Sequence, residues 1–170
     1  MTKGSAQAKY NYIGTPTTWI FAPARTKQAV VDTLTGGRVS VSANPYAPRV
    51  EFYADLDLDG KMDMMMGDNA KSSGKPVKFL VQLTGNIVAG ATCSVNVVKD
   101  GNKFGTFQAI GGKTTMVEFT DTPETIVRTY YRVAVEGPPT AYPQVPESMA
   151  LSGNMVGLSN PIYFNFNPNF

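Results

Sequence analysis

The sequence contains no histidine and only one cysteine among its 170 residues. Imidazole is the commonest general base and the commonest transition-metal ligand in proteins. We therefore expect neither a zinc or di-metal hydrolase centre nor a Ser-His-Asp triad, and Cys93 has no histidine with which to form a thiolate pair. The residues of this chain predict a protein that is not an enzyme by itself.

Charged residues are also scarce, at 16% of the chain, and the net charge is only +2. This mild balance, without a basic run that contains interleaved aromatic residues, argues against nucleic acid as a partner. No apolar run approaches the roughly 18 residues that a transmembrane helix needs, so we expect no membrane insertion. The first five residues lack the apolar segment of a signal peptide, which leaves a cytoplasmic protein or an excised fragment as alternatives.

Cys93 lies in an alternating run, residues 91–97, on the same side as the apolar residues. A free cysteine in such a run behaves as a small hydrophobe, and we expect it in the core. One cysteine cannot form an intramolecular disulfide, so this residue does not indicate a redox compartment.

The chain is rich in turn residues, with 16 Gly, 12 Pro and 42% hydrophobic residues. This composition is typical of short strands joined by tight turns. Apolar residues form short buried runs or recur at every second position in several segments, which predicts strands. These segments are 17–22, 38–42, 50–54, 77–83, 91–98, the run through Phe107, 117–119, 127–135 and 162–166.

One segment carries the signals of a helix. Thr26 suits an N-cap for residues 27–35, and the pair Gly36-Gly37 suits the C-terminal end. Four residues are expected to form its apolar face: Ala29, Val30, Thr33 and Leu34.

About seven to nine strands with one short helix near the N-terminus predict a mainly β fold, an antiparallel immunoglobulin-like β-sandwich. Residues 1–13 are polar and irregular, so we expect a flexible N-terminal segment followed by a single β-sandwich domain over residues 14–170. Asp100-Gly101 predicts a hairpin turn. Residues 140–159 are expected to form a long loop.

The sharpest local motif lies in residues 55–63, where four aspartates stand at positions 1, 3, 5 and 9. Hard oxygen ligands at this spacing suit Ca²⁺, and Gly60 permits the sharp turn at position 6. The spacing resembles the calcium loops of integrin-type propeller repeats and the first half of an EF-hand. It departs from the EF-hand at position 12, which is Met66 and not a bidentate Glu.

Two interpretations of this loop stay open, a solvated acidic turn and a structural calcium site. Mutual repulsion among four carboxylates in one short loop favours the cation. The predicted ligands are Asp55, Asp57, Asp59, the carbonyl of Lys61, and Asp63. A loop of moderate affinity would fill at the millimolar calcium found outside cells, which predicts an extracytoplasmic or secreted protein.

Two further motifs have ordinary explanations. The methionines of residues 62–66 are interpreted as packing residues and not as a copper site. Residues 111–114 look like the end of a phosphate loop, but Phe107 stands where its upstream glycine would be, so we expect a turn.

Five segments occur in an order and spacing that together resemble one known family. They are Gly14–Ile20, Leu34–Ser42, Met66-Gly67-Asp68, Tyr131-Arg132-Val133 and Ser159–Tyr163. The resemblance is to the C-terminal region of bacterial PHP-domain metallohydrolases, named for the polymerase and histidinol phosphatase family. It covers roughly residues 14–165.

In that family, the metal ligands are mostly histidines and carboxylates of a preceding catalytic domain. The resemblance therefore implies a non-catalytic accessory domain of a secreted metallohydrolase, whose partner is an N-terminal catalytic domain of the same parent chain. Thr17 stands where family members have Arg, so the resemblance does not imply that this strand reaches an active site.

The alternative function is a free-standing module that binds a carbohydrate or a cell-surface partner through Trp19 or the pair Tyr130-Tyr131. An exposed aromatic strip would favour this module, whereas an apolar face beside the N-terminus would favour the accessory domain. An independent hydrolase ranks third, because only carboxylate pairs remain and none stands in a recognisable catalytic frame.

Overall fold

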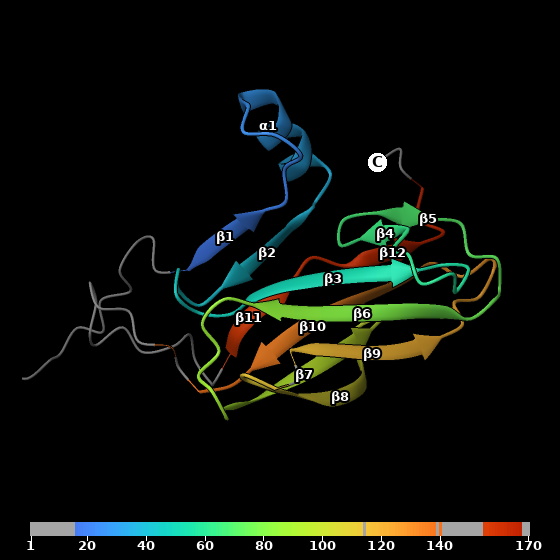
Figure 1. Cartoon of the computed structure of the whole chain (residues 1–170). Helices are drawn as coiled ribbons and strands as arrows, with labels where there is room; N and C mark the ends of the chain where they lie inside the picture. Colours follow the sequence, from blue (N-terminus) through green and yellow to red (C-terminus); the bar gives the residue numbers. More distant parts are fainter. Residues whose placement is uncertain (1–15, 114, 139, 141–154, 168–170) are drawn as a thin grey trace, which may run out of the picture.

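The structure, a computed structural model, describes residues 16–113, 115–138, 140 and 155–167 and consists of two packed β-sheets (Figure 1). The predicted fold class is confirmed: the chain is mainly β, an immunoglobulin-like β-sandwich, and the described residues include one short helix. The elements are β1 (Thr17–Ile20), α1 (Lys27–Thr35), β2 (Val39–Ser42), β3 (Arg49–Asp55), β4 (Met64–Met65), β5 (Asn69–Ala70), β6 (Val77–Thr84), β7 (Thr92–Lys99), β8 (Asn102–Ile110), β9 (Met116–Asp121), β10 (Thr129–Glu136), β11 (Met155–Ser159) and β12 (Ile162–Phe164).

The larger sheet has eight strands, in the order β1-β2-β11-β10-β12-β5, with β7 also paired to β10 and β8 paired to β7. The smaller sheet has four strands, in the order β4-β3-β6-β9. Neighbouring strands are antiparallel except for the short parallel pair of β12 and β5. Figure 1 shows β3, β6 and β9 lying across β10 and β7, so the core lies between these two layers.

The core contains the apolar residues that alternate along the predicted strands. In β3 and β6 every second side chain is buried, and the two strands are paired in full register from Arg49 and Thr84 to Asp55 and Lys78. Cys93 is buried in the same core, which confirms its sequence interpretation, and burial raises the pKa of its thiol. The core residues therefore follow from the period of the sequence.

Helix α1 begins and ends where the sequence predicts. The hydroxyl of Thr26 accepts a hydrogen bond from the backbone N–H of Ala29 at 3.2 Å, and Gly36 follows the last helical residue. The predicted apolar face is wrong at Leu34, which is exposed, whereas Thr33 is buried. The reason is the position of α1, which stands on the β1–β2 pair and away from the two-layer core (Figure 1).

Strand β11 lies inside the segment that the sequence predicts to be a loop, so that prediction is wrong for Met155–Ser159. Gly157 interrupts the apolar period of this strand. A Cβ at Gly157 would lie 2.7 Å from a methyl carbon of Val50, so the glycine permits β11 to pass close to β3. Because this close approach requires a glycine, β11 lacks the apolar side chain that would complete the period-two pattern of a strand in the sequence. Residues 141–154 of the predicted loop, like the predicted flexible segment 1–13, lie outside the described residues.

Two other predicted strand ends differ by a few residues. Val127 is exposed and precedes β10, which begins at Thr129. Phe166 lies beyond β12, because Asn165 adopts a left-handed φ of 61° and turns the chain. The hairpin turn at Asp100 and Gly101 is confirmed, with φ values of 51° and 81° as a type I′ turn requires.

A polar link joins the two sheets near one end of the core. The hydroxyl of Tyr131 in β10 donates to Oδ2 of Asp121 in β9 at 2.6 Å, and Nζ of Lys99 in β7 contacts the same oxygen at 2.6 Å. Burial opposes ionisation of Asp121, but the bonds from Lys99 and Tyr131 outweigh it and hold the pKa of this carboxyl below its usual value. The folded state therefore favours the charged carboxylate.

The Asp121 link should make stability depend on pH. Because the pKa of Asp121 is lower in the folded state, its contribution is complete above the unfolded value of about 3.9 and is lost as pH falls towards the folded value. Asp121→Asn should lower the free energy of unfolding by about 1–2 kcal/mol at pH 7, because the bonds to a charged acceptor are lost. The measurement is urea unfolding at neutral and acidic pH.

The matched control is Asp32→Asn, on the exposed surface of α1. At neutral pH the Asp32→Asn variant should unfold close to the wild type, because Asp32 is exposed. The difference in unfolding free energy between the wild type and Asp121→Asn should close as the pH falls. A gap that stays constant from neutral to acidic pH would contradict the charged link.

Candidate metal site

The acidic loop 55–63 connects β3 to β4, and the pairing of these strands brings its two ends together. Ala54 is the register partner of Met64, and the backbone N–H of Asp63 donates to the carbonyl of Ala54 at 2.9 Å. Asp55 and Asp63 therefore stand next to each other across the base of a hairpin, although eight positions separate them in the sequence.

Asp55 is buried and anchored by hydrogen bonds to the backbone of the loop. Its side chain is fully buried, Oδ1 accepts the N–H of Leu58 at 2.7 Å, and Oδ2 accepts the N–H of Gly60 at 2.9 Å. Burial opposes its ionisation, but the backbone donors, of which Gly60 and Leu58 contribute most, outweigh it and keep the pKa of Asp55 below its usual value. A buried carboxylate is thus held in its charged form at the bottom of the loop.

Two more carboxylates lie beside Asp55. One side-chain oxygen each from Asp55, Asp57 and Asp63 can be chosen so that all three lie within 4.8 Å of one another. Asp63 accepts the N–H of Leu56 at 2.8 Å, which keeps its side chain over the loop. Because Asp57 and Asp63 are exposed, the group is open to solvent on one side and could hold a metal ion.

The fourth predicted carboxylate, Asp59, does not belong to this group. Its Oδ1 accepts the N–H of Lys61 at 2.8 Å, and its Oδ2 lies 3.2 Å from Nζ of Lys61. This ion pair is exposed, so it contributes little to stability and is easily broken. Ligation by Asp59 and by the carbonyl of Lys61 stays a prediction.

Asp68 and the nearby methionines have structural contacts. Asp68 accepts two hydrogen bonds from the Arg38 guanidinium, at 3.0 and 2.8 Å, and one from the N–H of Met65 at 2.9 Å. Met64 and Met66 are buried in the core, whereas Met62 is exposed. Met65 packs against the same core, so the packing role predicted for the methionines is confirmed for these three and wrong for Met62.

Comparisons with known proteins identify no family. No family model matches the chain, and a search of curated proteins finds no significant match. Among solved structures, the chain is similar to the CARDB domain of the PF1109 protein from Pyrococcus furiosus, in complex with di-metal ions. The sequences are 14% identical, the match covers 70% of this chain and 94% of that chain, and the TM-score is 0.36. In the described part of this chain, no helix is long and apolar enough to cross a membrane.

Three of the five segments that carry the family resemblance meet at one place, which we call the Gly67 junction and define by Gly37, Arg38, Gly67, Asp68 and Asn160. The side chain of Asn160 donates to the carbonyl of Gly37 at 2.8 Å. The N–H of Gly67 donates to the carbonyl of Pro161 at 2.7 Å. Arg38 and Asp68 form the ion pair described above. The junction ties the end of α1, the turn after β4 and the turn between β11 and β12 to one another.

The aromatic residues that the sequence offers for sugar binding separate into different environments. Tyr131 is fully buried in the core, so its role is packing. Tyr130 is half-buried and its ring lies 6.4 Å from that of Tyr163. Trp19 is half-buried and lines a cavity with residues of other strands, which sequence reasoning did not bring together.

Proposed function

We propose that this chain is a non-catalytic accessory domain of a secreted PHP-type metallohydrolase, and that its loop 55–63 holds one structural Ca²⁺. The observation that carries the calcium proposal is the gathering of the Asp55, Asp57 and Asp63 carboxylates at the base of a hairpin. The observation that supports the accessory role is the meeting of three resembling segments at the Gly67 junction.

The donor set fits calcium in chemistry and in size. Carboxylate oxygens are hard ligands, which Ca²⁺ prefers, and the chain contains no histidine for a softer metal. Ca²⁺ binds oxygen at about 2.3–2.6 Å, so two oxygens on one ion lie at most about 5 Å apart. The spacing of the three aspartates, within 4.8 Å, meets this limit. Because Asp55 is buried and held ionised, its charge is available without a further cost of deprotonation.

A cation in this loop would stabilise structure. It would tie Asp55, the last residue of β3, to Asp63, the residue before β4. The Gly67 junction begins a few residues later, so the closed hairpin would also fix the chain where the three segments meet. When bound, the ion supplies positive charge that relieves the repulsion among the three carboxylates.

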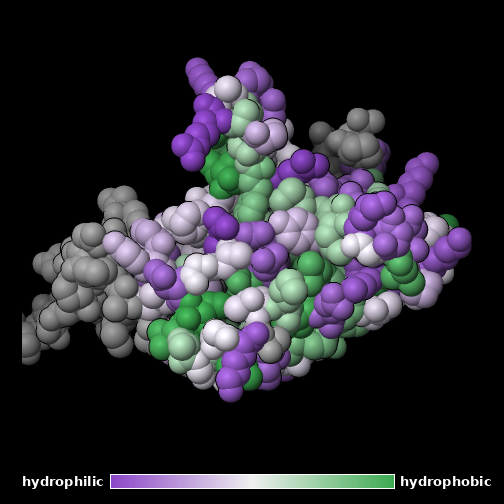
Figure 2. Space-filling model, in the orientation of Figure 1, coloured by the Kyte–Doolittle hydropathy of each residue, from purple (hydrophilic) through white to green (hydrophobic). Residues whose placement is uncertain are grey.

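Exposed apolar residues support a neighbouring domain as the partner. Ile20, Val31 and Leu34 are large hydrophobic residues that remain exposed on β1 and α1. These elements project from the sandwich at the N-terminal side of the described chain, and Figure 2 shows hydrophobic surface on this projecting part. An apolar surface of this kind suits contact with a catalytic domain of the same parent chain.

Calcium should raise the melting temperature of this domain. An ion that binds only the folded state stabilises it by about 2.7 kcal/mol at a hundredfold excess over Kd. Asp57→Ala should remove most of this gain, and it should leave the melting temperature without calcium unchanged or higher, because it removes one of several mutually repelling charges. The measurements are calorimetric titration and thermal melting at millimolar calcium.

Two control variants sharpen the calcium experiment. Asp32→Ala, on α1 and outside the loop, should keep the full gain from calcium. Asp59→Ala tests whether Asp59 is a calcium ligand. If Asp59 leaves its ion pair with Lys61 and binds the ion, the calcium-dependent rise in melting temperature should be smaller in this variant; if it does not, the rise should be unchanged. A wild-type titration without detectable heat, together with no shift in melting at millimolar calcium, would return the loop to the acidic-turn interpretation.

The parent protein is tested separately, by the reading frame that contains this sequence. We propose that the upstream codons encode an export signal and a PHP-type catalytic domain that contains the histidine ligands. A complete upstream sequence without such a domain would overturn the accessory role and leave the calcium proposal untouched.

A further inference from the structure

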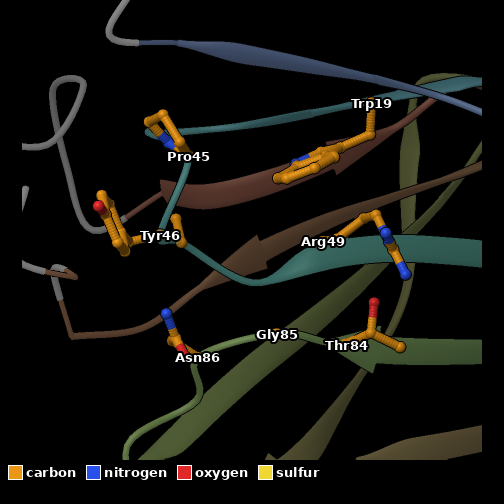
Figure 3. Close-up of a pocket in the computed structure, with 8 residues that line it drawn as sticks. Trp19, Pro45, Tyr46, Arg49, Thr84, Gly85 and Asn86 are labelled. Carbon is orange, nitrogen blue, oxygen red and sulfur yellow. The ribbon is translucent and has the colours of Figure 1, made fainter.

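A cavity of about 130 Å³ lies between β1, the turn that joins β2 to β3, and the end of β6 (Figure 3). In Figure 3 the indole of Trp19 forms one wall, Arg49 stands at one end, and Tyr46 stands at the other. Thr84, Gly85 and Asn86 lie opposite the indole. Residues from three separate parts of the sequence thus surround one space.

The indole wall is held in place by the strand beside it. Nε1 of Trp19 donates to the hydroxyl of Ser42 at 2.9 Å, and this hydroxyl donates to the carbonyl of Pro48 at 2.7 Å. Because the indole N–H is already used, the ring offers the cavity an apolar face, and the guanidinium carbon of Arg49 lies over this ring, 5.5 Å from its centroid. An apolar ring face with a few converging polar groups is the usual composition of a small-molecule site.

The polar end of the cavity is built by a cross-strand network. Arg49 in β3 is the register partner of Thr84 in β6. Glu51 accepts hydrogen bonds from Nε of Arg49 at 3.1 Å and from the hydroxyl of Thr84 at 3.2 Å. The hydroxyl of Tyr53 donates to the same carboxylate at 2.8 Å, and burial together with this bond raises the pKa of Tyr53 to about 12. Tyr53 therefore remains a donor at neutral pH, and the network is organised before any ligand arrives.

The charge of this end is balanced. Nη2 of Arg49 lies 3.0 Å from Oε1 of Glu51, so the positive charge already has its counter-ion. A neutral ligand is therefore favoured over an anion, because an anion would have to compete with Glu51 for the guanidinium. The bonds to Glu51 use two of the three nitrogens of Arg49, which leaves N–H donors for a ligand.

Asn86 completes the set of polar groups. Its side chain is exposed at the cavity and makes no hydrogen bond to any other residue of the described ranges. A free carboxamide offers a donor and an acceptor to the same ligand. A ring with hydroxyl groups around its edge and an apolar face would use both kinds of wall.

The size of the cavity fits one ring. An enclosed apolar cavity of about 150 Å³ holds benzene, a six-membered ring without substituents. This cavity has a similar volume, about 130 Å³, and is open to solvent on one side, so a sugar ring can enter it while some of its hydroxyl groups stay in solvent. The other aromatic surface of the described chain is less suitable. It consists of Tyr130 and Tyr163 on the larger sheet and Phe166 just beyond β12. Successive rings are inclined by 49° and 70°, so they form no flat platform.

We propose that this cavity binds one neutral sugar ring, which stacks on Trp19 and hydrogen-bonds through its hydroxyl groups to Arg49, Thr84 and Asn86. The site lies on a different part of the domain from the calcium loop. The inference goes beyond the accessory role and does not depend on the parent enzyme or on the metal.

The chain contains a single tryptophan, so its fluorescence reports on this cavity alone. The wild-type chain is titrated with glucose, galactose, mannose and N-acetylglucosamine as separate probes, and at least one should change the emission of Trp19 in a saturable way. Asn86→Ala should weaken this binding about tenfold, the effect of losing hydrogen bonds worth about 1.4 kcal/mol. Asn102→Ala, at the start of β8, is the matched control and should bind as the wild type does.

Three results would overturn the sugar site. The first is that none of the four sugars changes the emission of Trp19 in a saturable way up to about 100 mM. A Kd above this concentration corresponds to a binding free energy of little more than 1 kcal/mol or less. The second is a saturable change in Trp19 emission with benzoate or inorganic phosphate while none of the four sugars causes one, which would assign the cavity to an anion. The third is equal affinity of Asn86→Ala and wild type, with both proteins folded by circular dichroism.

Discussion

Phe79→Ala is expected to lower the free energy of unfolding by about 3–5 kcal/mol, because it removes the central ring of the core. Phe79 is fully buried, and its ring centroid lies 4.8 Å from that of Phe119 and 5.8 Å from that of Phe52 in the same sheet. It also lies 4.5 Å from the ring of Tyr131 in the opposite sheet. A void at this position cannot be filled without moving both sheets. The measurement is urea unfolding at neutral pH.

Phe107→Ala is the matched control, since it deletes the same side chain at the edge of the core. Phe107 is partly buried and stacks on Phe119 at 5.6 Å. Its loss should cost clearly less than the loss of Phe79, because solvent and neighbouring side chains can occupy the vacated space. Equal losses for the two variants would show that Phe79 is not the centre of the packing.

Gly67→Ala is expected to lower the free energy of unfolding by about 3 kcal/mol or more, through backbone strain and overlap together. Gly67 has a left-handed φ of 94°, which side chains other than glycine rarely adopt. A Cβ there would overlap the carbonyl oxygen of Gly36 and lie 2.5 Å from the carbonyl carbon of Gly37. The Gly67 junction would have to open to admit one methyl group. Urea unfolding gives the size of the loss.

Gly90→Ala is a control that separates backbone strain from steric overlap of the new Cβ. Gly90 also has a left-handed φ, of 79°, but a Cβ there would meet no atom within 4 Å. Only the backbone term applies, which is about 1–2 kcal/mol. If Gly67→Ala costs no more than Gly90→Ala, the backbone contact at the Gly67 junction contributes nothing to stability.

The sequence predicts those parts of the fold where a local signal is sufficient. Strands β3 and β6 were predicted because a sheet with one buried face requires a period of two. The start of α1 was predicted because Thr26 has the chemistry of an N-cap. Strand β11 was missed because Gly157 serves a contact with Val50, a residue more than a hundred positions away. Strands of two residues, such as β4 and β5, are too short to show any period.

The candidate sites divide in the same way. The spacing of the acidic loop was enough to predict that Asp55, Asp57 and Asp63 gather. The direction of the Asp59 side chain depends on a local turn, in which the carboxylate bonds to the N–H two residues ahead, and the ligand spacing does not reveal it. The cavity at Trp19 was missed because strand register, and not sequence proximity, places Arg49 beside Thr84.

The pairing of β2 with β11 also has a consequence for how the chain folds. Asn160 and Gly37, which this pairing brings together, are 123 positions apart in the sequence. Contacts between such distant residues close large loops, and domains dominated by them fold in milliseconds to seconds instead of microseconds. During synthesis on the ribosome, β2 therefore cannot enter the larger sheet until β11, more than a hundred residues later in the sequence, has been made. Until then the exposed apolar residues of β1 and α1 lie on a segment that is not yet paired with the rest of the larger sheet.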